Sequence, residues 1–483
     1  MSTLQEKIEE RREKEEFLKS RGIIDGNGKL VAYYLAKYME EEYNSICMPG
    51  RLIYCYNGRI YNLLDENIFI SKAASVLEFD EYRMLLKGTK RRELVDFLSD
   101  TTLGNSLKSI DEKISDNKRY LTLNNCLLDL ETMGVSAHTP NIFTTNLLNY
   151  DYDPDASTEK FEIYVKSLFE NSKEMVYYVQ EVMGYVLYKG MPVHSVFFLI
   201  GEAGTGKSAL TKIVKAMLGE DNIVTLNVSQ IRDEKYLITL KDKLLNVSDE
   251  FGDSYIAPKS VETLKAISAN GDVTGRVIYN QPITFKSYAK LFFSMNDFPT
   301  FIDNTFALFD RIYVIKFEKN FRNTNSEIME IEKQFMGKGM SGVLNFALQG
   351  LRRLKSRDFR FSVPRKMITE KESYKLQNNN VWAFFSDCMA PKRGARIRIK
   401  DAYEAYEKYV KENYKTLKTC VKRHKFTSML ESTFGVKIIN PQGYKTILDY
   451  TLADEENIEP GFKYSADPDE LSDDELLKQI VSA

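Results

Sequence analysis

A glycine-rich turn between an apolar strand and a helix restricts this chain more than any other feature. The segment GEAGTGKSAL directly follows HSVFFLI and matches the pattern GxxxxGKS at Gly201, Gly206, Lys207 and Ser208. The glycines of such a turn let backbone N–H groups close around phosphate oxygens, and the next helix directs the positive end of its dipole at the same anion. The pattern therefore predicts a phosphate-binding loop (P-loop) in an α/β fold, with an ordinary glycine turn as the alternative.

This loop predicts ATP with Mg²⁺ as the cofactor. Lys207 would neutralise the β and γ phosphates, and the Ser208 hydroxyl would ligate Mg²⁺. The residues expected to line the nucleotide are Gly201, Glu202, Ala203, Gly204, Thr205, Gly206, Lys207, Ser208 and Ala209.

An acidic partner for the loop follows a later apolar strand. In KLLNVSDEFGD that strand ends at Asp249 and Glu250. Asp249 would hold the Mg²⁺ shell, and Glu250 would polarise the attacking water. An isolated Asp-Glu pair is more often a solvated loop start, but its interval after the phosphate loop favours the catalytic interpretation.

Two further polar residues lie at strand ends. In AKLFFSMNDFP the strand ends in Asn296, whose amide can hydrogen-bond the γ-phosphate and the lytic water, or can belong to an ordinary Asn-Asp turn. In LFDRIYVIKF, Arg311 immediately precedes a strand. This arginine can reach the γ-phosphate of a neighbouring subunit, or it can pair with Asp310. The predicted catalytic residues are Lys207, Asp249, Glu250, Asn296 and Arg311.

Composition excludes several classes of protein. The 483 residues suffice for several domains, and a formal net charge of -2 excludes a uniformly basic nucleic-acid binder. Charge is uneven instead: residues 391–425 hold twelve Lys or Arg against four Asp or Glu, whereas residues 454–475 hold ten acids and one Lys. The five cysteines have no paired spacing, which favours a reducing compartment. The sequence has no membrane-length apolar run and a highly charged N-terminus, so we expect a cytoplasmic protein without membrane contact.

The ordered motifs resemble those of a superfamily 3 DNA helicase of the poxvirus and phage or plasmid primase-helicase type, including replication initiators of mobile elements. The resemblance rests on GEAGTGKS, LLNVSDE, LKAISANGDVTGRVIYNQPITF, AKLFFSMNDFP and FDRIYVIKF, and YLTLNNCLLDLETMGVSAHTP resembles the domain that precedes the motor. It extends over residues 30–450 and is most specific in the motor. It implies an ATP-driven homo-hexamer that moves 3′ to 5′ along single-stranded DNA, with a separate primase as a partner.

The family also places a β-hairpin in the central channel, where it grips single-stranded DNA. Here that hairpin would run from about Thr274 to Lys286. Its candidate DNA contacts are Arg276, Tyr279, Asn280 and Lys286. Tyr279 could stack on a base, although a strand tyrosine is more often packed in a core. Lys265 matches a family position that reaches the neighbouring subunit's nucleotide, and its alternative is a solvated helix lysine.

The basic C-terminal region has a pattern of its own. VWAFFSDCM, KDAYEAYEKYVKENY and CVKRHKFTSMLESTFG have apolar residues at helical spacing, and VKIINPQGYKTILDY is typical of two strands around a turn. Three helices and such a hairpin predict a winged helix, whose third helix enters the major groove. Lys422, Arg423 and Lys425 would then contact duplex DNA. A basic surface without a partner is the alternative.

Together these patterns predict an α/β protein with a P-loop AAA+-like motor around a parallel central sheet. The predicted segments are a charged helix (1–20), an N-terminal mixed α+β accessory domain (21–150), an ATPase domain with a preceding helical collar (151–335), a helical connector (336–375), the winged helix (376–453) and an acidic tail (454–483). We expect an ATP-dependent DNA helicase that initiates replication of a phage, plasmid or mobile island. The alternative is a nucleotide-switched DNA-binding regulator or loader that does not unwind DNA.

The division of roles in the acidic pair predicts the effect of Glu250→Gln. The variant should bind ATP normally but hydrolyse it about 10² to 10⁴ times more slowly, because the amide keeps the size of the side chain and loses the charge that polarises water. Equilibrium nucleotide binding and steady-state hydrolysis measure the two effects separately. Loss of ATP binding would mean that the roles of the pair are assigned wrongly.

Overall fold

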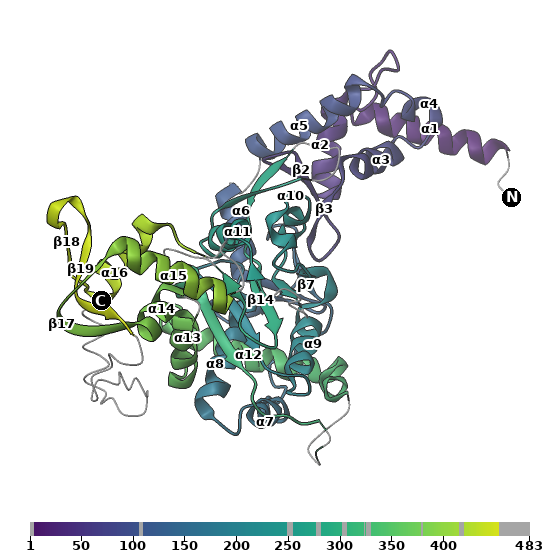
Figure 1. Ribbon diagram of the computed structural model, residues 1–483. Coiled ribbons are helices and arrows are strands. Elements are labelled where there is room, and N and C mark those ends of the chain that lie inside the picture. Colours follow the sequence, from purple (N-terminus) through teal and green to yellow (C-terminus); the bar gives the residue numbers. More distant parts are fainter. Residues whose placement is uncertain are drawn as a thin grey trace. The chain divides into compact units, whose positions relative to one another are not determined.

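The chain divides into two structural units in the computed structural model (Figure 1). The first unit comprises Met1–Pro299 and Asp310–Ile368, and the second comprises Thr300–Phe309 and Thr369–Ala483. The structure describes residues 4–105, 110–248, 255–276, 282–301, 307–322, 324, 330–377, 380–414 and 420–453. Within these ranges, no helix is both long enough and apolar enough to cross a lipid bilayer.

The described residues among the first 150 form several helices and two small sheets. The helices are α1 (Leu4–Ser20), α2 (Ala32–Tyr43), α3 (Glu66–Val76), α4 (Asp80–Arg83), α5 (Thr89–Asn105) and α6 (Ile110–Arg119). The first sheet is antiparallel, in the order β1 (Ser45–Met48), β2 (Leu52–Tyr56), β3 (Tyr61–Leu64). The second has the order β6-β5-β4-β7, with β4 (Tyr120–Leu123), β5 (Leu127–Asp129), β6 (Val135–Ser136) and β7 (Leu147–Leu148). Apolar side chains of α1, α2, α3 and α5 share a core with β1 and β2, so this region has a hydrophobic core of its own.

The charged first helix, α1, is fixed mainly through its C-terminal end. Leu18 is buried in the core, whereas Ile8 is 59% exposed. Ion pairs join Lys14 to Glu78 at 2.6 Å and Arg11 to Glu81. Exposed pairs of this kind are screened by solvent and contribute little, so burial of the apolar end is the larger stabilising term.

A five-stranded parallel sheet forms the centre of the first unit. Its order is β16-β8-β14-β10-β9, with β8 (Val196–Ile200), β9 (Ile223–Val224), β10 (Leu245–Ser248), β14 (Lys290–Met295) and β16 (Ile312–Lys316). Every residue of β8 and β14 is buried, as is typical of central strands in a parallel sheet. Ile200 pairs with Met295 on one side and with Lys316 on the other. The carboxyl ends of β8, β14 and β16 therefore lie at the same height in the sheet.

Helices and short turns complete the first unit. They are α7 (Glu159–Leu168), α8 (Lys173–Leu187), α9 (Lys207–Leu218), α10 (Glu234–Leu237), α11 (Pro258–Ser268) and α12 (Met340–Ser356), with the 3-10 turns η1 (Glu220–Asn222), η2 (Gln230–Arg232), η3 (Ile238–Leu240), η5 (Ile331–Phe335) and η6 (Gly337–Gly339), and the short strand β11 (Tyr255–Ile256). The 3-10 turn η4 (Phe309–Arg311) has Phe309 in the second unit and Asp310 and Arg311 in the first. α8 and α12 approach closely, because a Cβ on Gly350 would lie 2.0 Å from the Gln180 carbonyl oxygen. The buried Glu181 carboxylate in α8 accepts hydrogen bonds from Arg353 in α12 at 2.7 Å and from the Ser362 N–H at 2.6 Å, so its charge is paired.

A β-hairpin lies between α11 and β14 in the sequence. β12 (Asp272–Gly275) and β13 (Ile283–Lys286) pair antiparallel, and the Thr274 and Thr284 hydroxyls lie 3.2 Å apart across the pair. The hairpin begins two residues before the predicted start at Thr274. Its tip, residues 277–281, lies outside the described part of the chain.

Three helices and a three-stranded antiparallel sheet form most of the second unit. The helices are α14 (Asn380–Cys388), α15 (Ile399–Tyr414) and α16 (Arg423–Phe434), and the sheet has the order β17-β19-β18, with β17 (Met389–Arg398), β18 (Ile438–Ile439) and β19 (Thr446–Leu452). The unit also contains β15 (Thr300–Phe301), η8 (Pro441–Gly443) and most of α13 (Arg365–Gln377). Phe384, Tyr406 and Phe426 from the three helices lie in one core. β17 is an additional strand that the sequence analysis did not predict, because its cation-rich segment lacks a clear apolar alternation.

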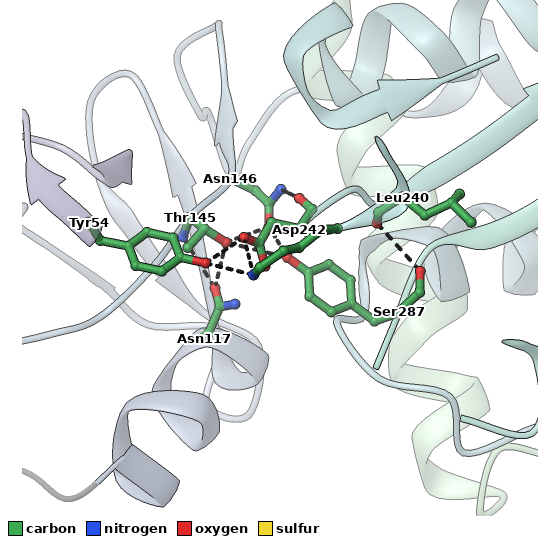
Figure 2. Close-up of polar contacts among 9 residues, drawn as sticks. Tyr54, Asn117, Thr145, Asn146, Leu240, Asp242 and Ser287 are labelled. Atoms are coloured by element: carbon green, nitrogen blue, oxygen red, sulfur yellow. Dashed lines mark hydrogen bonds and ion pairs between the residues drawn. The ribbon is translucent and has the colours of Figure 1, made fainter. Parts of the chain in front are cut away.

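A polar network joins the N-terminal region to the amino ends of the central strands (Figure 2). Asp242, shortly before β10, accepts hydrogen bonds from the Tyr54 hydroxyl in β2 at 2.7 Å and from Lys241 Nζ at 2.9 Å. Asn146 donates to the Asp242 carbonyl oxygen at 2.7 Å and accepts from the Tyr288 hydroxyl, just before β14, at 3.1 Å. These contacts fix the amino ends of β10 and β14 relative to the small sheets.

Two buried lysines extend this network. Lys189 Nζ donates to Asn117 Oδ1 and to the Tyr120 carbonyl oxygen, both at 3.1 Å. Burial lowers the pKa of Lys189 to about 7, against a weaker opposing effect of the Asp242 carboxylate. Lys290, the first residue of β14, is also fully buried, and burial lowers its pKa well below the ordinary value.

The lowered pKa of Lys189 predicts a pH-dependent stability. Between pH 7 and 10.5 the unfolded chain binds more protons at this residue than the folded chain, so the free energy of unfolding should rise with pH by up to about 1.4 kcal/mol per unit. Lys189→Met keeps an apolar stem, removes the titrating amine, and should make the rise of the unfolding free energy with pH less steep, while buried Lys290 still contributes a rise of the same sign. Denaturant midpoints measured from pH 6.5 to 9 test this.

The matched control is Lys212→Met, because the Lys212 side chain is 62% exposed. This control should keep the wild-type dependence on pH. Parallel pH profiles for the wild type and Lys189→Met would contradict the assignment, whatever the absolute stability of the variant.

Candidate functional site

The turn after β8 has a backbone conformation that requires glycine. Gly206 is the N-cap of α9 with φ 84°, and Gly204 has φ 86°. Both angles lie in the left-handed region that glycine adopts without steric cost. A Cβ on Gly206 would also lie 2.4 Å from Leu168 Cδ2. Gly204 and Gly206 therefore determine the shape of the loop.

Lys207 places its ammonium group where β8 and β14 end. The residue is buried, and its Nζ donates to the carbonyl oxygens of Gly201 and Met295, the latter at 2.8 Å, and to Asn296 Oδ1 at 3.4 Å. Burial lowers the pKa of Lys207, and the Asp297 carboxylate opposes that shift. Neutral carbonyl and amide oxygens do not cancel the charge of a buried ammonium group, so the site favours an anion.

The rest of the loop can supply further contacts to a phosphate group. Its exposed residues are Glu202, Ala203, Gly204 and Ser208. Thr205 is buried, and its hydroxyl donates to the Glu202 carbonyl oxygen at 2.8 Å, which closes the turn. Ser208 lies in the first turn of α9, where backbone N–H groups attract an anion, and Ala209 is half-buried beside it. One ammonium group, a hydroxyl and a helix N-terminus together fit a polyphosphate that carries a divalent cation.

The structure places Asn296 beside Lys207 but does not describe the acidic pair. Asn296 directly follows β14 and is exposed, so its amide can also contact a ligand. Asp249 and Glu250 lie outside the described residues. Ser248, which precedes them, pairs with Phe293 of β14. The roles of the acidic residues and of Asn296 stay predictions.

Residues 317–322, after β16, line the back of the loop, a contact that the sequence did not predict. The Phe321 N–H donates to the Gly204 carbonyl oxygen at 2.9 Å. A Cβ on Gly204 would lie 2.8 Å from Asn320 Oδ1 and 2.9 Å from Arg322 Cβ. The exposed Arg322 therefore adds a cation next to the loop. Its one sequence signal, the short run KNFR, is too common to distinguish it from a surface segment.

The structure does not bring Arg311 to Lys207. Arg311 is half-buried immediately before β16, and Ile312 pairs with Val196, the first residue of β8. One five-residue parallel strand, about 16 Å long, therefore separates Arg311 from the level of the loop. Lys265 is half-buried in α11, and its predicted contact with a neighbouring nucleotide stays a prediction.

The candidate DNA contacts belong to two parts of the protein. Arg276 and Lys286, on the arms of the β12–β13 hairpin, are exposed. Tyr279 and Asn280 fall in the tip, outside the described residues. In the second unit, Lys422 is the N-cap of α16 and is exposed together with Arg423, whereas Lys425 is half-buried.

Two family models match parts of the chain. The model described as "D5 N terminal like" matches residues 32–170. A family of unknown function (DUF5906) matches residues 199–311, which include the glycine-rich loop at residues 201–208, Asn296 and Arg311.

Two viral relatives have helicase names. A protein of Acanthamoeba polyphaga mimivirus named "Putative helicase" is 23% identical over 250 residues, which cover 48% of this chain and 25% of the relative. A "Putative helicase" of Invertebrate iridescent virus 3 is 20% identical over 390 residues, which cover 72% of this chain and 41% of the relative. The chain thus spans between a quarter and two fifths of these relatives, to which it is similar at low identity.

Among solved structures, the chain is similar to the C-terminal region of NrS-1. One apo structure of that region has a TM-score of 0.49 at 12% identity and covers 87% of this chain and 99% of the other. A second has a TM-score of 0.48 at 10% identity and covers 86% and 99%.

The Lys207 geometry predicts the effect of Lys207→Ala. The variant should lose the predicted ATP hydrolysis down to background, because the loop has no second buried ammonium group at the ends of β8 and β14 among the described residues. Its stability should stay close to wild type, since removing a desolvated charge offsets the lost hydrogen bonds. Lys212→Ala, five residues later in α9, is the matched control and should retain hydrolysis. Normal turnover in Lys207→Ala would remove the motor hypothesis.

Proposed function

We propose that the chain is an ATP-hydrolysing DNA helicase that acts in the initiation of replication of a phage, plasmid or mobile element. The proposal depends on one observation: the Lys207 ammonium group is buried between the ends of two adjacent parallel strands, beside Asn296. The helicase names of two viral relatives support it. Because this chain spans less than half of each relative, their helicase names alone do not establish its activity.

ATP with Mg²⁺ is the proposed cofactor, because the residues of the loop fit it. When bound, ATP supplies the phosphoanhydride bond whose hydrolysis drives the motor. Lys207 would exchange its carbonyl acceptors for phosphate oxygens, and Ser208 and Asp249 would hold Mg²⁺. Glu250 would orient the attacking water, and Asn296 would hold that water or the γ-phosphate.

The proposed DNA contacts lie on the β12–β13 hairpin and on the second unit. Exposed Arg276 and Lys286 on the hairpin arms support a contact with single-stranded DNA. The order α14-β17-α15-α16-β18-β19 in the second unit supports a winged helix with α16 as its recognition helix. Lys422, Arg423 and Lys425 at the start of α16 would then contact duplex DNA.

The proposed assembly is a superfamily 3, AAA+-like homo-hexamer that moves 3′ to 5′ and works with a separate primase. In the central sheet, β14 separates the loop strand β8 from β10, which supports a site with Asn296 between the loop and the acidic pair. Arg311 lies at the amino end of the edge strand β16, about a strand length from its own loop. That position favours a contact with a neighbouring subunit, and Lys265 is the second candidate for such a contact.

Strand displacement from a forked duplex tests the proposal directly. The wild type should displace the strand with ATP and Mg²⁺, and Lys207→Ala should not. A protein that binds ATP and duplex DNA without displacement would instead be a nucleotide-switched regulator or loader.

The position of Arg311 predicts complementation between two inactive variants. Arg311→Ala should bind ATP and hydrolyse it about 10³ to 10⁵ times more slowly, as for a cation that completes a neighbouring site. Mixing it with Lys207→Ala should restore part of the ATP hydrolysis, since mixed rings contain interfaces where an intact loop meets an intact arginine. If Arg311 only pairs with Asp310, the single variant should keep near-normal turnover, because such a pair contributes under about 1 kcal/mol.

A further inference from the structure

A four-residue bulge interrupts β17 opposite a single residue of β19. The two strands pair up to Pro391 and again from Arg396, so residues 392–395 stand opposite Asp449 alone. The Gly394 N–H donates to Asp449 Oδ1 at 2.7 Å, and both residues have left-handed backbones, with φ 81° and 61°. Bulges of this kind redirect side chains at the edge of a sheet, and here the Asp449 carboxylate fixes the shape.

Cations line the bulge and the adjoining strand. The exposed cations are Lys392, Arg393, Arg396 and Arg398. Ile397 packs against the core of the second unit, so strand alternation places Arg396 and Arg398 together on the outer face, about 7 Å apart. Residues 391–400 contain five Lys or Arg and no acid, in a chain whose formal net charge is -2. The positive charge is therefore a local feature of this strand.

An exposed tyrosine orients the last of these arginines. The Arg398 guanidinium lies 5.0 Å from the centre of the Tyr444 ring, and Tyr444 is 59% exposed. The Ile399 N–H donates to the Lys445 carbonyl oxygen at 2.9 Å, which holds the end of β17 against this turn. A stacked guanidinium loses little further freedom when it binds a phosphate group.

α15 follows β17 in the chain and contacts the segment that precedes α16. α15 begins directly after Arg398, and the Tyr403 hydroxyl near its start donates to the Val421 carbonyl oxygen at 2.8 Å. Val421 is next to Lys422, the N-cap of α16. The start of α15, directly after the basic strand, is therefore held near the start of α16.

We propose that Lys392, Arg393, Arg396 and Arg398, together called the β17 arm, form a second DNA contact that binds the phosphate backbone of a duplex beside the groove entered by α16. The inference rests on the proposed function and extends its duplex contact to a strand that the sequence analysis did not predict. A duplex fits because its backbone presents regularly spaced phosphate charges to a row of cations. In this arrangement α16 contacts the base edges, and the β17 arm contacts phosphates alone.

Loss of the bulge cations tests the β17 arm in the full chain. Fluorescence anisotropy on a labelled duplex, from 50 to 200 mM NaCl, should show binding at least about ten-fold weaker for Lys392→Ala/Arg393→Ala at the lowest salt. The slope of log K against log salt should fall by about 1.8, as expected for two lost phosphate contacts. Lys408→Ala/Lys411→Ala, which removes two exposed cations from α15, is the control and should stay within about two-fold of wild type.

Asp449→Ala distinguishes two roles of Asp449, because an electrostatic role and a positioning role predict opposite changes in duplex affinity. Asp449→Ala removes a negative charge, so a purely electrostatic effect would tighten duplex binding. If Asp449 positions the bulge, the same variant should instead weaken binding several-fold. Asp449→Asn keeps an oxygen that can accept from the Gly394 N–H, and it should bind at least as tightly as wild type.

The outcomes separate this inference from the proposed function. If Lys392→Ala/Arg393→Ala binds duplex within about two-fold of wild type while Lys422→Ala/Arg423→Ala loses binding, the β17 arm is overturned and the contact by α16 stands. If the wild type shows no salt-dependent duplex binding, the proposed DNA contact fails as well. ATP hydrolysis without DNA should be unchanged in the bulge variants, which reports an intact motor.

Discussion

The rest of the site depends on the hydrogen bonds of the buried Lys207 ammonium group. It lies where β8, β14 and α9 meet, and its acceptors come from the ends of both strands. A buried cation with only neutral acceptors is costly unless an anion balances it. The parallel register supplies the geometry, since Ile200 and Met295 pair directly and bring the loop and Asn296 to one edge. The glycines then bring the helix N-terminus to the same point.

The amino ends of the central strands, opposite the Lys207 site, are held by a polar network. Asp242, Asn146 and Tyr288 tie the amino ends of β10 and β14 to the small sheets of the first 150 residues (Figure 2). The fully buried Lys290, at the start of β14, donates to the carbonyl oxygens of Gly190 at 2.7 Å and Tyr288 at 2.9 Å. Polar networks of this type are stable only when every member is paired, and they therefore specify one arrangement. The position of the predicted site thus depends on contacts at both ends of the same strands.

Local signals in the sequence predicted the loop, the strand before it and the helix after it, because a few contiguous residues determine that turn. Asn296 was predicted for the same reason, as a polar residue at the end of an apolar strand. The Lys189 and Asp242 contacts could not be predicted, since they join residues far apart in the chain. β17 was missed because its pairing partner, β19, comes after two intervening helices and its bulge breaks the alternation. The separation of Arg311 from the loop became visible only through the strand register.

A crystal structure of the protein with Mg²⁺ and a slowly hydrolysed ATP analogue is the most direct test of the nucleotide site. We expect Lys207 Nζ within about 3 Å of β- and γ-phosphate oxygens, in place of its hydrogen bond to the Met295 carbonyl oxygen, with Ser208 coordinating Mg²⁺. Asn296 should face the γ-phosphate. A nucleotide bound elsewhere, or a loop in which Lys207 keeps all its carbonyl contacts while the analogue is bound, would contradict the assignment of this loop as the catalytic centre.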